Sequence, residues 1–361
     1  MCFSKKSCIL AKILRIEKMS KKIFKIVLIT FIVLVAVIGA IAWYAYAQIT
    51  KENGCDKEYS LYVCGTTTKS DVINVIAKNS GEDFAWWVDK IFEVKKRSVN
   101  RYVGFYKITP KMRAWDIYQL LALGDNSTTT VTFNNIRTKR ELTEAICKNL
   151  NMPVDSLYSA ISNANVCESY GFDTVSIVTM FLPDSYNIYK TTSVKNFLDR
   201  MNKEYNAYWN EARLNKAVEN GMTPYEVTIL ASIVEEETKK ADEMATVAGL
   251  YINRLRIDMP LQSDPTVKFA IGDFSLRRIL NKHLEIESPY NTYKYKGLPP
   301  GPIRIPSKVA IEKTLNYKES KYLYMCAKED FSGYHNFATT LREHNNNAAK
   351  YRRELNRRKI K

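Results

Sequence analysis

The sequence predicts an α+β protein with three parts: an N-terminal transmembrane helix, a small β-α-α-β module and a larger mixed α/β domain. Three observations predict this class. Residues 26–47 form an uncharged apolar run, two strand patterns enclose two helical patterns after it, and helical patterns with short strands fill the chain beyond residue 128. With 361 residues and 46% hydrophobic content, the chain has room for two or three packed domains.

The apolar run at residues 26–47 predicts a membrane anchor. At 1.5 Å per residue, a helix of this length spans about 33 Å, enough for a bilayer core of about 30 Å. Residues 1–25 hold eight lysines and arginines against one acid, Glu17, so this basic segment is expected in the cytoplasm and the chain after Gln48 outside it. Trp43, Tyr44 and Tyr46 are then expected at the outer interface.

A cleaved signal peptide is the alternative to this anchor. Residues 45–47, Ala-Tyr-Ala, resemble a small-residue cleavage site. The apolar run is longer than the usual 7 to 15 residues of a signal peptide, which favours a retained anchor in a single-pass protein of the cytoplasmic membrane. Met19 is a second candidate start, in which case residues 1–18 are an upstream extension of the reading frame.

Residues 48–128 read as the small module. Strand patterns at residues 58–63 and 101–109 enclose helical patterns at 70–78 and 82–94, and a further helix is expected at 113–123, ending at Gly124. The turn-rich residues 125–129 predict the boundary to a second domain at residues 129–361.

The second domain is predicted to mix short strands with helices. A strand at 130–133 and a helix at 139–150 come first, residues 181–186 read as a loop, and residues 193–220 read as one solvated helix. Residues 242–256 predict another packed helix, Asp264 is expected to cap a short helix that starts at Pro265, and a strand pair at 322–327 and 334–338 precedes a basic terminal helix.

The centre of this domain is a predicted helix at residues 223–241. Thr223 suits the N-cap, Pro224 the first helical position, and Glu226 completes a capping box. Spacings of three and four then place Val227, Leu230, Val234, Glu237 and Ala241 on one core-facing stripe.

Glu237 is therefore a carboxylate on an apolar stripe, whereas Glu235 and Glu236 point away from it, in directions that leave either free to be solvated. Burial raises a carboxyl pKa, as a general acid near neutral pH requires. The alternative is a residue at the edge of the stripe that reaches water or pairs with a lysine. The pattern alone leaves both interpretations open.

Charge and residue spacing exclude other classes of function. The formal net charge is +16, but much of it lies before residue 26 and after Lys350, so nucleic acid is not predicted as a partner. No metal or other cofactor is predicted, because His283, His335 and His344 lack ligand spacing and the glycines form no phosphate loop. The expected extracytoplasmic cysteines are odd in number, and spacing does not decide whether Cys55 and Cys64 pair: Cys55, Cys64, Cys147, Cys167, Cys326.

Ordered motifs carry a family resemblance. They lie at residues 104–112, 181–186, 232–238 (SIVEEET), 252–255, 259–267 (MPLQSDPTV), 290–293 (YNTY), 297–303 (GLPPGPI), 322–324, 335–337 and 343–345. Their order resembles that of YceG-like endolytic murein transglycosylases, which also have a single-pass anchor. The module at 48–128 separately resembles LysM modules, which bind N-acetylglucosamine-containing glycans.

The resemblance implies a reaction and a catalytic residue. Family members cleave the β-1,4 bond between N-acetylmuramic acid and N-acetylglucosamine in nascent glycan strands and leave 1,6-anhydro-muramyl ends. Their catalytic acid is the glutamate before the threonine of the E-x-E-T motif, which is Glu237 here. A hydrolase would need a second carboxylate to activate water or to act as nucleophile, for which Asp264 and Glu235 are the candidates.

The strongest motif matches also imply substrate contacts. Amide, carboxylate and phenol groups suit the hydroxyl and N-acetyl groups of a sugar chain, so the expected contacts are Gln262, Asp264, Tyr290 and Asn291. Capping and loop hydrogen bonds are the alternative role for these side chains.

The expected protein is thus a membrane-anchored lytic transglycosylase with its catalytic domain outside the cytoplasmic membrane. Its expected partners are peptidoglycan glycan strands, the membrane and peptidoglycan synthases. A hydrolytic muramidase and a non-catalytic glycan-binding scaffold remain the alternatives.

Overall fold

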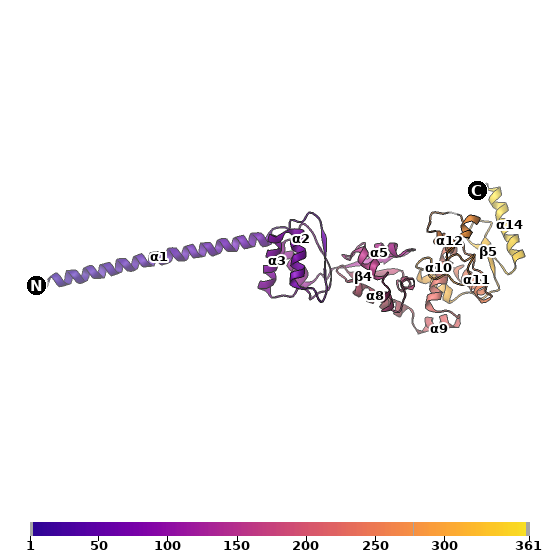
Figure 1. The fold of residues 1–361 in the computed structure, drawn as a ribbon, viewed down its shortest axis with the longest axis horizontal. Coiled ribbons are helices and arrows are strands. Elements are labelled where there is room, and N and C mark those ends of the chain that lie inside the picture. Colours follow the sequence, from indigo (N-terminus) through magenta and orange to yellow (C-terminus); the bar gives the residue numbers. More distant parts are fainter. Residues whose placement is uncertain (1–2, 277, 359–361) are drawn as a thin grey trace. The chain divides into compact units, whose positions relative to one another are not determined.

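A computed structural model describes the backbone of residues 3–276 and 278–358, with side chains from residue 19 onward except residue 20 (Figure 1). The chain divides into two compact units that meet between Asp125 and Asn126. This division falls inside the predicted turn-rich segment at residues 125–129. Each unit is described by itself.

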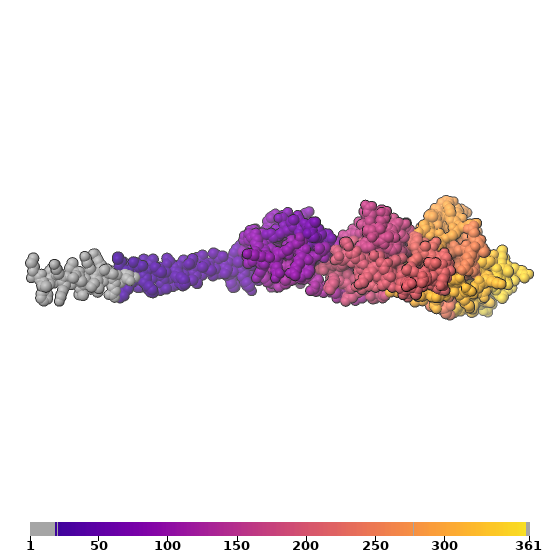
Figure 2. Space-filling view, turned by 90° about the horizontal axis from the view of Figure 1, so that it is seen from below, coloured from indigo at the N-terminus to yellow at the C-terminus, as the bar shows by residue number. Residues whose placement is uncertain are grey.

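The first unit begins with the long helix α1 (Phe3–Thr50). The predicted span at residues 26–47 lies inside it, and the helix continues on both sides. Its stretch Lys21–Thr50 is long and apolar enough to cross a membrane. Figure 2 shows the side chains of this stretch uncovered along the helix, and residues 21–44 are all exposed. Its length and its exposed apolar side chains are consistent with a membrane anchor.

The module that follows α1 has the predicted β-α-α-β order. Its elements are β1 (Tyr59–Val63), α2 (Lys69–Ser80), α3 (Glu82–Lys95) and β2 (Gly104–Ile108), followed by α4 (Ala114–Leu123). The two strands pair antiparallel, with Tyr59 opposite Ile108. Thr68 caps α2 through a capping box, and Gly81, at φ 92°, forms the sharp joint between α2 and α3 that few other residues tolerate.

The second unit starts with a two-stranded antiparallel sheet, β3 (Thr128–Phe133) against β4 (Asp184–Tyr189). The prediction of a loop at residues 181–186 is wrong from Asp184 onward. Tyr186 and Ile188 alternate into the core of this region, which makes the segment a strand. Between the strands lie short helices: α5 (Lys139–Cys147), α6 (Val154–Ala160), α7 (Ala164–Glu168) and the 3-10 turn η1 (Ser176–Met180).

The single solvated helix predicted at residues 193–220 is also wrong. The chain forms α8 (Val194–Tyr208) and a separate α9 (Glu211–Glu219). Asn210 accepts a hydrogen bond from the Arg213 backbone N–H and so caps a new helix, which interrupts the first one.

The core of the second unit forms around α10 (Pro224–Glu237), which packs against α11 (Met244–Arg256) and α13 (Lys308–Leu315). The predicted capping box at Thr223 and Glu226 is present. All side chains from Val227 to Val234 are buried, so α10 is covered on every side instead of along one stripe. The helix ends at Glu237, and Ala241 lies beyond it and exposed, which corrects the predicted end of the stripe.

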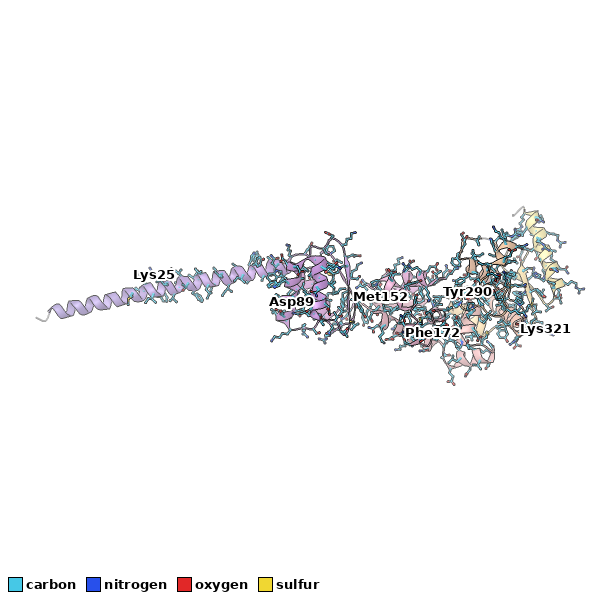
Figure 3. The ribbon with its side chains drawn as sticks, viewed as in Figure 1. Lys25, Asp89, Met152, Phe172, Tyr290 and Lys321 are labelled. Atoms are coloured by element: carbon cyan, nitrogen blue, oxygen red, sulfur yellow. The ribbon has the colours of Figure 1, made fainter. Side chains whose placement is uncertain are left out.

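The remaining elements surround this core. They are α12 (Asp264–Ile271), the 3-10 turn η2 (Asn281–Glu285), the antiparallel pair β5 (Tyr324–Ala327) and β6 (His335–Ala338), and α14 (Leu341–Arg357). Asp264 is the first residue of α12, and Ser263 occupies the N-cap position, so the predicted cap at Asp264 is off by one residue. In Figure 3 the labelled Tyr290 marks the loop that follows η2.

Candidate active site

A cavity of about 250 Å³ lies where α10 ends. Helix α11, the loop before α12, the loop around Tyr293 and the β5–β6 pair contribute the rest of its lining. Its polar side chains are Glu237, Tyr251, Arg254, Gln262, Asp264, Tyr293 and His335.

The carboxyl group of Glu237 is held by two hydroxyl groups. The Tyr251 hydroxyl donates to Oε1 at 2.8 Å, and the Ser263 hydroxyl donates to the same oxygen at 2.5 Å. Among the described residues, both hydrogen bonds to this carboxyl group go to Oε1. This geometry fixes the plane of the carboxyl group and leaves Oε2 for a ligand.

Burial raises the pKa of Glu237 above its ordinary value. The hydrogen bonds from Ser263 and Tyr251 favour the charged form and oppose this shift, whereas the nearby charge of Asp264 adds to it. A carboxyl group of this kind can carry a proton nearer to neutral pH than an exposed glutamate can.

His335 reaches the cavity from β6 and is fixed by Glu243. The His335 backbone N–H donates to Glu243 Oε1, and Nδ1 lies 2.8 Å from Glu243 Oε2. The Glu243 side chain is buried. In a neutral imidazole this contact keeps the proton on Nδ1 and makes Nε2 a hydrogen-bond acceptor.

Arg254 brings a buried positive charge to the cavity. Its Nε donates to the Leu323 carbonyl oxygen at 2.7 Å, and its Nη1 donates to the Leu261 carbonyl oxygen at 2.8 Å. Burial lowers the pKa of Arg254, and the nearby Tyr251 and Glu237 oppose that shift. The side chain thus ties the loop before α12 to the β5 region and places its charge beside the carboxyl site.

Two loops are joined behind the cavity through Thr292. Its Oγ1 accepts from the Ser263 backbone N–H at 3.0 Å and lies 2.8 Å from Thr266 Oγ1. The Tyr293 hydroxyl donates to Asp264 Oδ1 at 2.6 Å. These bonds hold Ser263 where its hydroxyl reaches Glu237.

Three of the five predicted site residues meet at this cavity. Glu237, Gln262 and Asp264 line it together. Gln262 has a positive φ of 51°, an uncommon conformation for a residue other than glycine, and its backbone N–H donates to the Thr292 carbonyl oxygen. Such local strain often accompanies a functional loop.

The other two predicted residues do not line the cavity. Asn291 is 0% exposed, its side-chain amide donates to the carbonyl oxygens of Leu284 and Ile286, and its Oδ1 accepts from Tyr293. Tyr290 packs its ring 4.8 Å from that of Phe269. Both side chains hold the loop that supports the site.

The YceG-like family pattern matches residues 62–350 of the chain. The chain belongs to the YceG-like family.

Curated relatives and a solved structure agree with this assignment. The endolytic murein transglycosylase of Bacillus subtilis (strain 168) is 39% identical over 160 residues, which cover 44% of this chain and 43% of that protein. The endolytic murein transglycosylase of Streptococcus pneumoniae (strain ATCC BAA-255 / R6) is 33% identical over 177 residues, 47% of this chain and 31% of that protein. The matches thus span less than half the length of these relatives.

The fold is shared with a crystal structure of a putative YceG-like protein from Listeria monocytogenes. The TM-score is 0.52 at 22% sequence identity, and the match covers 80% of this chain and 98% of the other.

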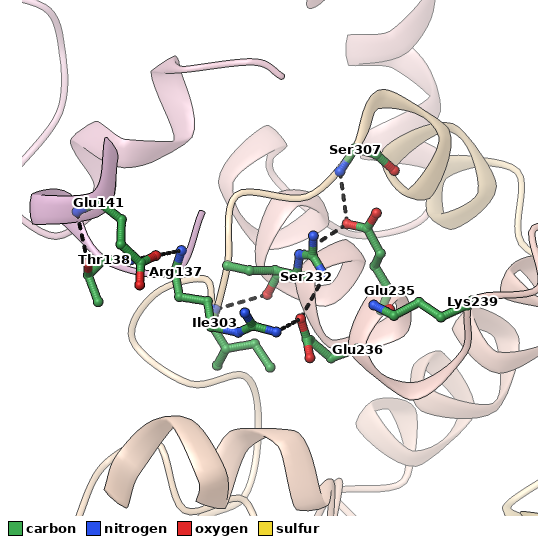
Figure 4. Close-up of polar contacts among 10 residues, drawn as sticks. Arg137, Thr138, Glu141, Ser232, Glu235, Glu236, Lys239, Ile303 and Ser307 are labelled. Carbon is green, nitrogen blue, oxygen red and sulfur yellow. Dashed lines mark hydrogen bonds and ion pairs between the residues drawn. The ribbon is translucent and has the colours of Figure 1, made fainter. Parts of the chain in front are cut away.

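In this YceG-like chain, Glu235 and Glu236 form an ion network, so neither takes the solvated position that the sequence pattern left open (Figure 4). Arg304 Nη1 lies 2.7 Å from Glu236 Oε1, and Arg304 Nε lies 3.4 Å from Glu235 Oε2. Arg137 Nη2 reaches Glu236 Oε1 at 2.9 Å. Burial would raise the pKa of Glu236, but the two guanidinium groups hold it below its usual value.

The same network ties α10 to the loop before α13. Glu235 Oε2 accepts from the Ser307 backbone N–H at 2.9 Å, and the buried Ser232 hydroxyl accepts from the Ile303 backbone N–H at 3.1 Å (Figure 4). Of three consecutive glutamates, two are therefore neutralised as structural ion pairs, and Glu237 alone faces the cavity.

The described residues of this YceG-like chain contain no group of three or more histidine, cysteine or acidic side chains that could hold a metal ion. The cysteines from Cys55 onward are free thiols, so the open question of a Cys55–Cys64 bridge is answered by two separate thiols.

Sequence reasoning missed five polar residues of the site: Tyr251, Arg254, Ser263, Tyr293 and His335. Tyr251 looked like a packing residue of its helix, and His335 lacked a neighbour with ligand spacing. The signal that could have found four of them is membership in the ordered motifs, whereas Tyr251 lies one residue before the motif at 252–255. Their convergence on Glu237 arises only from the packing of α11 and β6 around the end of α10.

Proposed function

We propose that this chain is a membrane-anchored endolytic lytic transglycosylase of peptidoglycan. It cleaves the β-1,4 bond from N-acetylmuramic acid to N-acetylglucosamine in nascent strands, leaves 1,6-anhydro-muramyl ends and so terminates glycan elongation. The observation that carries the proposal is the Glu237 carboxyl group, with raised pKa and one oxygen held by Tyr251 and Ser263, in a polar cavity. The relatives named endolytic murein transglycosylase support the substrate class.

Glu237 acts first as the acid. Its proton goes to the glycosidic oxygen as the bond from the muramyl C1 to that oxygen breaks, and the N-acetylglucosamine side leaves as an alcohol. Positive charge develops at C1, and the carboxylate left behind stabilises it at short range.

Glu237 then acts as the base. The carboxylate takes the proton of the muramyl C6 hydroxyl while that oxygen attacks C1, which closes the 1,6-anhydro ring. No water enters the product, and the glutamate ends protonated as it began. One carboxyl group suffices because the first transfer creates the base that the second requires.

The surrounding side chains take supporting roles. Oε2 of Glu237 moves the proton, because Oε1 is occupied by Tyr251 and Ser263. Gln262 and Asp264 contact the sugar hydroxyl and acetamido groups from the loop before α12. Tyr290 and Asn291 act on the substrate only through the loop that they hold.

A muramidase is the second candidate, and one observation favours it. Asp264 lies in the same cavity as Glu237, and a hydrolase needs a second carboxylate to activate water or to serve as a nucleophile. The Tyr293 hydroxyl already occupies Asp264 Oδ1, which favours a substrate-binding role for this residue.

Each part of the chain has its own role in this proposal. Residues 1–25 are cytoplasmic, residues 26–47 span the cytoplasmic membrane, the LysM-like module at residues 48–128 binds glycan, and residues 129–361 carry the reaction outside. Glycan strands are the substrate, and peptidoglycan synthases are the partners that would deliver them.

The test is to weigh the ends of the products. Full-length protein in detergent is incubated with uncross-linked glycan, and the muramyl ends are analysed by mass spectrometry. The proposal predicts ends that are one water lighter than reducing ends. Reducing ends alone would identify a muramidase, and intact glycan together with full complementation by Glu237→Gln would identify a scaffold.

A further inference from the structure

The first unit carries an exposed tryptophan face on α3. Trp86 is 50% exposed, and its ring lies 4.7 Å from that of Trp87. The Trp87 ring in turn lies 6.1 Å from that of Tyr44 on α1. These three neighbouring aromatic rings form a contiguous patch, and such patches mark protein or membrane interaction sites more often than singly exposed residues do.

The position of Tyr44 along α1 sets the depth of this face, given that α1 spans the membrane. Tyr44 follows Ile26 by about 18 residues, which is about 27 Å along a helix. A bilayer core is about 30 Å thick, so Tyr44 lies near the outer boundary of the hydrocarbon. Trp87 packs against Tyr44 and therefore lies at about the same depth.

Helix α3 is oriented to meet a flat surface there. Figure 1 shows α3 on the side of the module that faces back along α1, running across the direction of that helix. The labelled Asp89 in Figure 3 marks its middle. Because α3 and α4 both contact α1, the module is held against the membrane-proximal end of the anchor.

The chemistry around the tryptophans fits the headgroup layer. A groove of about 980 Å³ next to them is lined by Gln48 and Lys51 of the α1 end and by Glu82 and Asp83 of α3. The Lys90 ammonium lies 5.5 Å from the centre of the Trp86 ring. Lipid headgroups offer both phosphate and ammonium groups to such a mixed rim, and tryptophan is enriched at this layer.

We propose that the Trp86 face of α3 docks into the outer headgroup layer of the bilayer. The module then contacts the bilayer surface through this face. A face that stacks sugar rings would instead have to lie in water, away from the membrane.

The experiment uses the full-length chain in vesicles of phosphatidylethanolamine and phosphatidylglycerol, with and without lipids brominated near the headgroup end of the acyl chain. The expected result is that Trp86→Phe lowers the lipid-quenched tryptophan emission by about one third, because Trp43, Trp86 and Trp87 would be the three interfacial tryptophans. Circular dichroism confirms that the variant is folded.

Two variants give matched controls. Trp209→Phe removes a tryptophan that is 4% exposed in the second unit and should leave the lipid-quenched emission unchanged. Trp43→Phe removes a tryptophan of the anchor and should lower it whether or not α3 docks.

The proposal is overturned if Trp86→Phe removes only emission that aqueous iodide quenches. It is equally overturned if soluble N-acetylglucosamine oligomers, and not brominated lipid, change the Trp86 emission. The effect of Trp43→Phe then shows whether α1 itself still spans the bilayer.

Discussion

At the scale of single residues, the proposed chemistry depends on how Glu237 differs from its two neighbours. Glu235 and Glu236 are neutralised by guanidinium groups, whereas Glu237 receives hydroxyl hydrogen bonds on one oxygen and has a raised pKa. The same residue type thus serves two purposes within three positions. The difference lies in the partners, which come from distant parts of the chain.

Removal of the Tyr251 hydroxyl should shift the pH profile of the reaction. The hydrogen bond from Tyr251 favours the charged form of Glu237, so Tyr251→Phe raises the Glu237 pKa further. A general acid is active when protonated, and activity falls as pH rises through its pKa. The alkaline limb of kcat/KM should therefore move to higher pH, with kcat lower by about tenfold.

A matched control for this change is Tyr106→Phe. Tyr106 is a buried tyrosine of the first unit whose hydroxyl donates to the Tyr102 carbonyl oxygen. The pH profile of kcat/KM for Tyr106→Phe should match that of the wild type. An alkaline limb of Tyr251→Phe that stays in place would show that the Tyr251 hydroxyl does not tune Glu237.

At the scale of elements, the end of α10 is held by the ion network and by the loop at residues 288–293. Arg304 is 6% exposed, and its charge is shared by Glu235 and Glu236. The loop is fastened by the amide of Asn291. Neither Arg304 nor Asn291 lines the cavity, so both side chains act on Glu237 and Ser263 only by holding the elements around them.

Loss of Arg304 should destabilise the second unit strongly. Arg304→Ala leaves two largely buried carboxylates short of a partner, which costs about 3 kcal/mol in the free energy of unfolding near pH 7. The paired Glu236 has a lowered pKa, so the pairing contributes fully above the unfolded carboxyl pKa and is lost as pH falls. The destabilisation by Arg304→Ala should therefore become smaller toward pH 4. Denaturant unfolding at several pH values measures it.

The control for Arg304 is Arg140→Ala, which removes an exposed pair with Asp155. Such pairs contribute less than about 1 kcal/mol. Equal losses for the two variants would mean that the Arg304 network is no stronger than a surface ion pair.

Asn291→Ala separates the two roles considered for this residue. As a loop anchor, its loss leaves two partly buried carbonyl oxygens and the Tyr293 N–H without their side-chain partner, and we expect about 2 kcal/mol of destabilisation. Thermal unfolding measures this, with the exposed Asn316→Ala as control. Unchanged stability together with a raised KM would make Asn291 a substrate contact instead.

At the scale of the whole molecule, the first unit holds the apolar helix α1 and the β-α-α-β module, and the second unit holds the candidate site. The boundary lies at Asp125, and the family pattern covers residues 62–350, both sides of it. The orientation across the membrane can be tested through one thiol of the module.

Cys64 should be labelled from outside the cell. Hydrogen bonds from Thr66 and Thr67 lower the pKa of Cys64 to about 7, so much of this thiol is deprotonated at neutral pH. A membrane-impermeant maleimide added to intact cells should modify it, and Cys64→Ser should abolish most of the label. Labelling that appears only after lysis would contradict an extracytoplasmic module.

Sequence patterns predicted those elements whose signals lie within their own residues. The capping box at Thr223 and the apolar run at residues 26–47 carry their own signals, and the structure has a helix at each. The break at Asn210 and the strand at Asp184–Tyr189 depend on a cap and on pairing with β3, which a helix or loop pattern does not contain.

The candidate site was likewise predictable only where the signal lies within one element. Glu237 could be singled out from its place in α10, although the helix proved to be buried on all sides and to end there. Tyr251, Ser263 and His335 converge on it from sites 14 to 98 residues later in the chain. No local pattern predicts such convergence, and a family resemblance supplies only the order of the motifs.

The central claim is that Glu237 supplies both proton transfers. The most direct test is the single-turnover rate of anhydro-ended product, measured by mass spectrometry for the wild type and for Glu237→Gln, with Glu226→Gln on the same helix as control. The account predicts a loss of at least about a hundredfold for Glu237→Gln, since an amide cannot transfer the proton, and a rate near that of wild type for Glu226→Gln, since glutamine preserves the capping box. Anhydro ends formed by Glu237→Gln at the wild-type rate would contradict it.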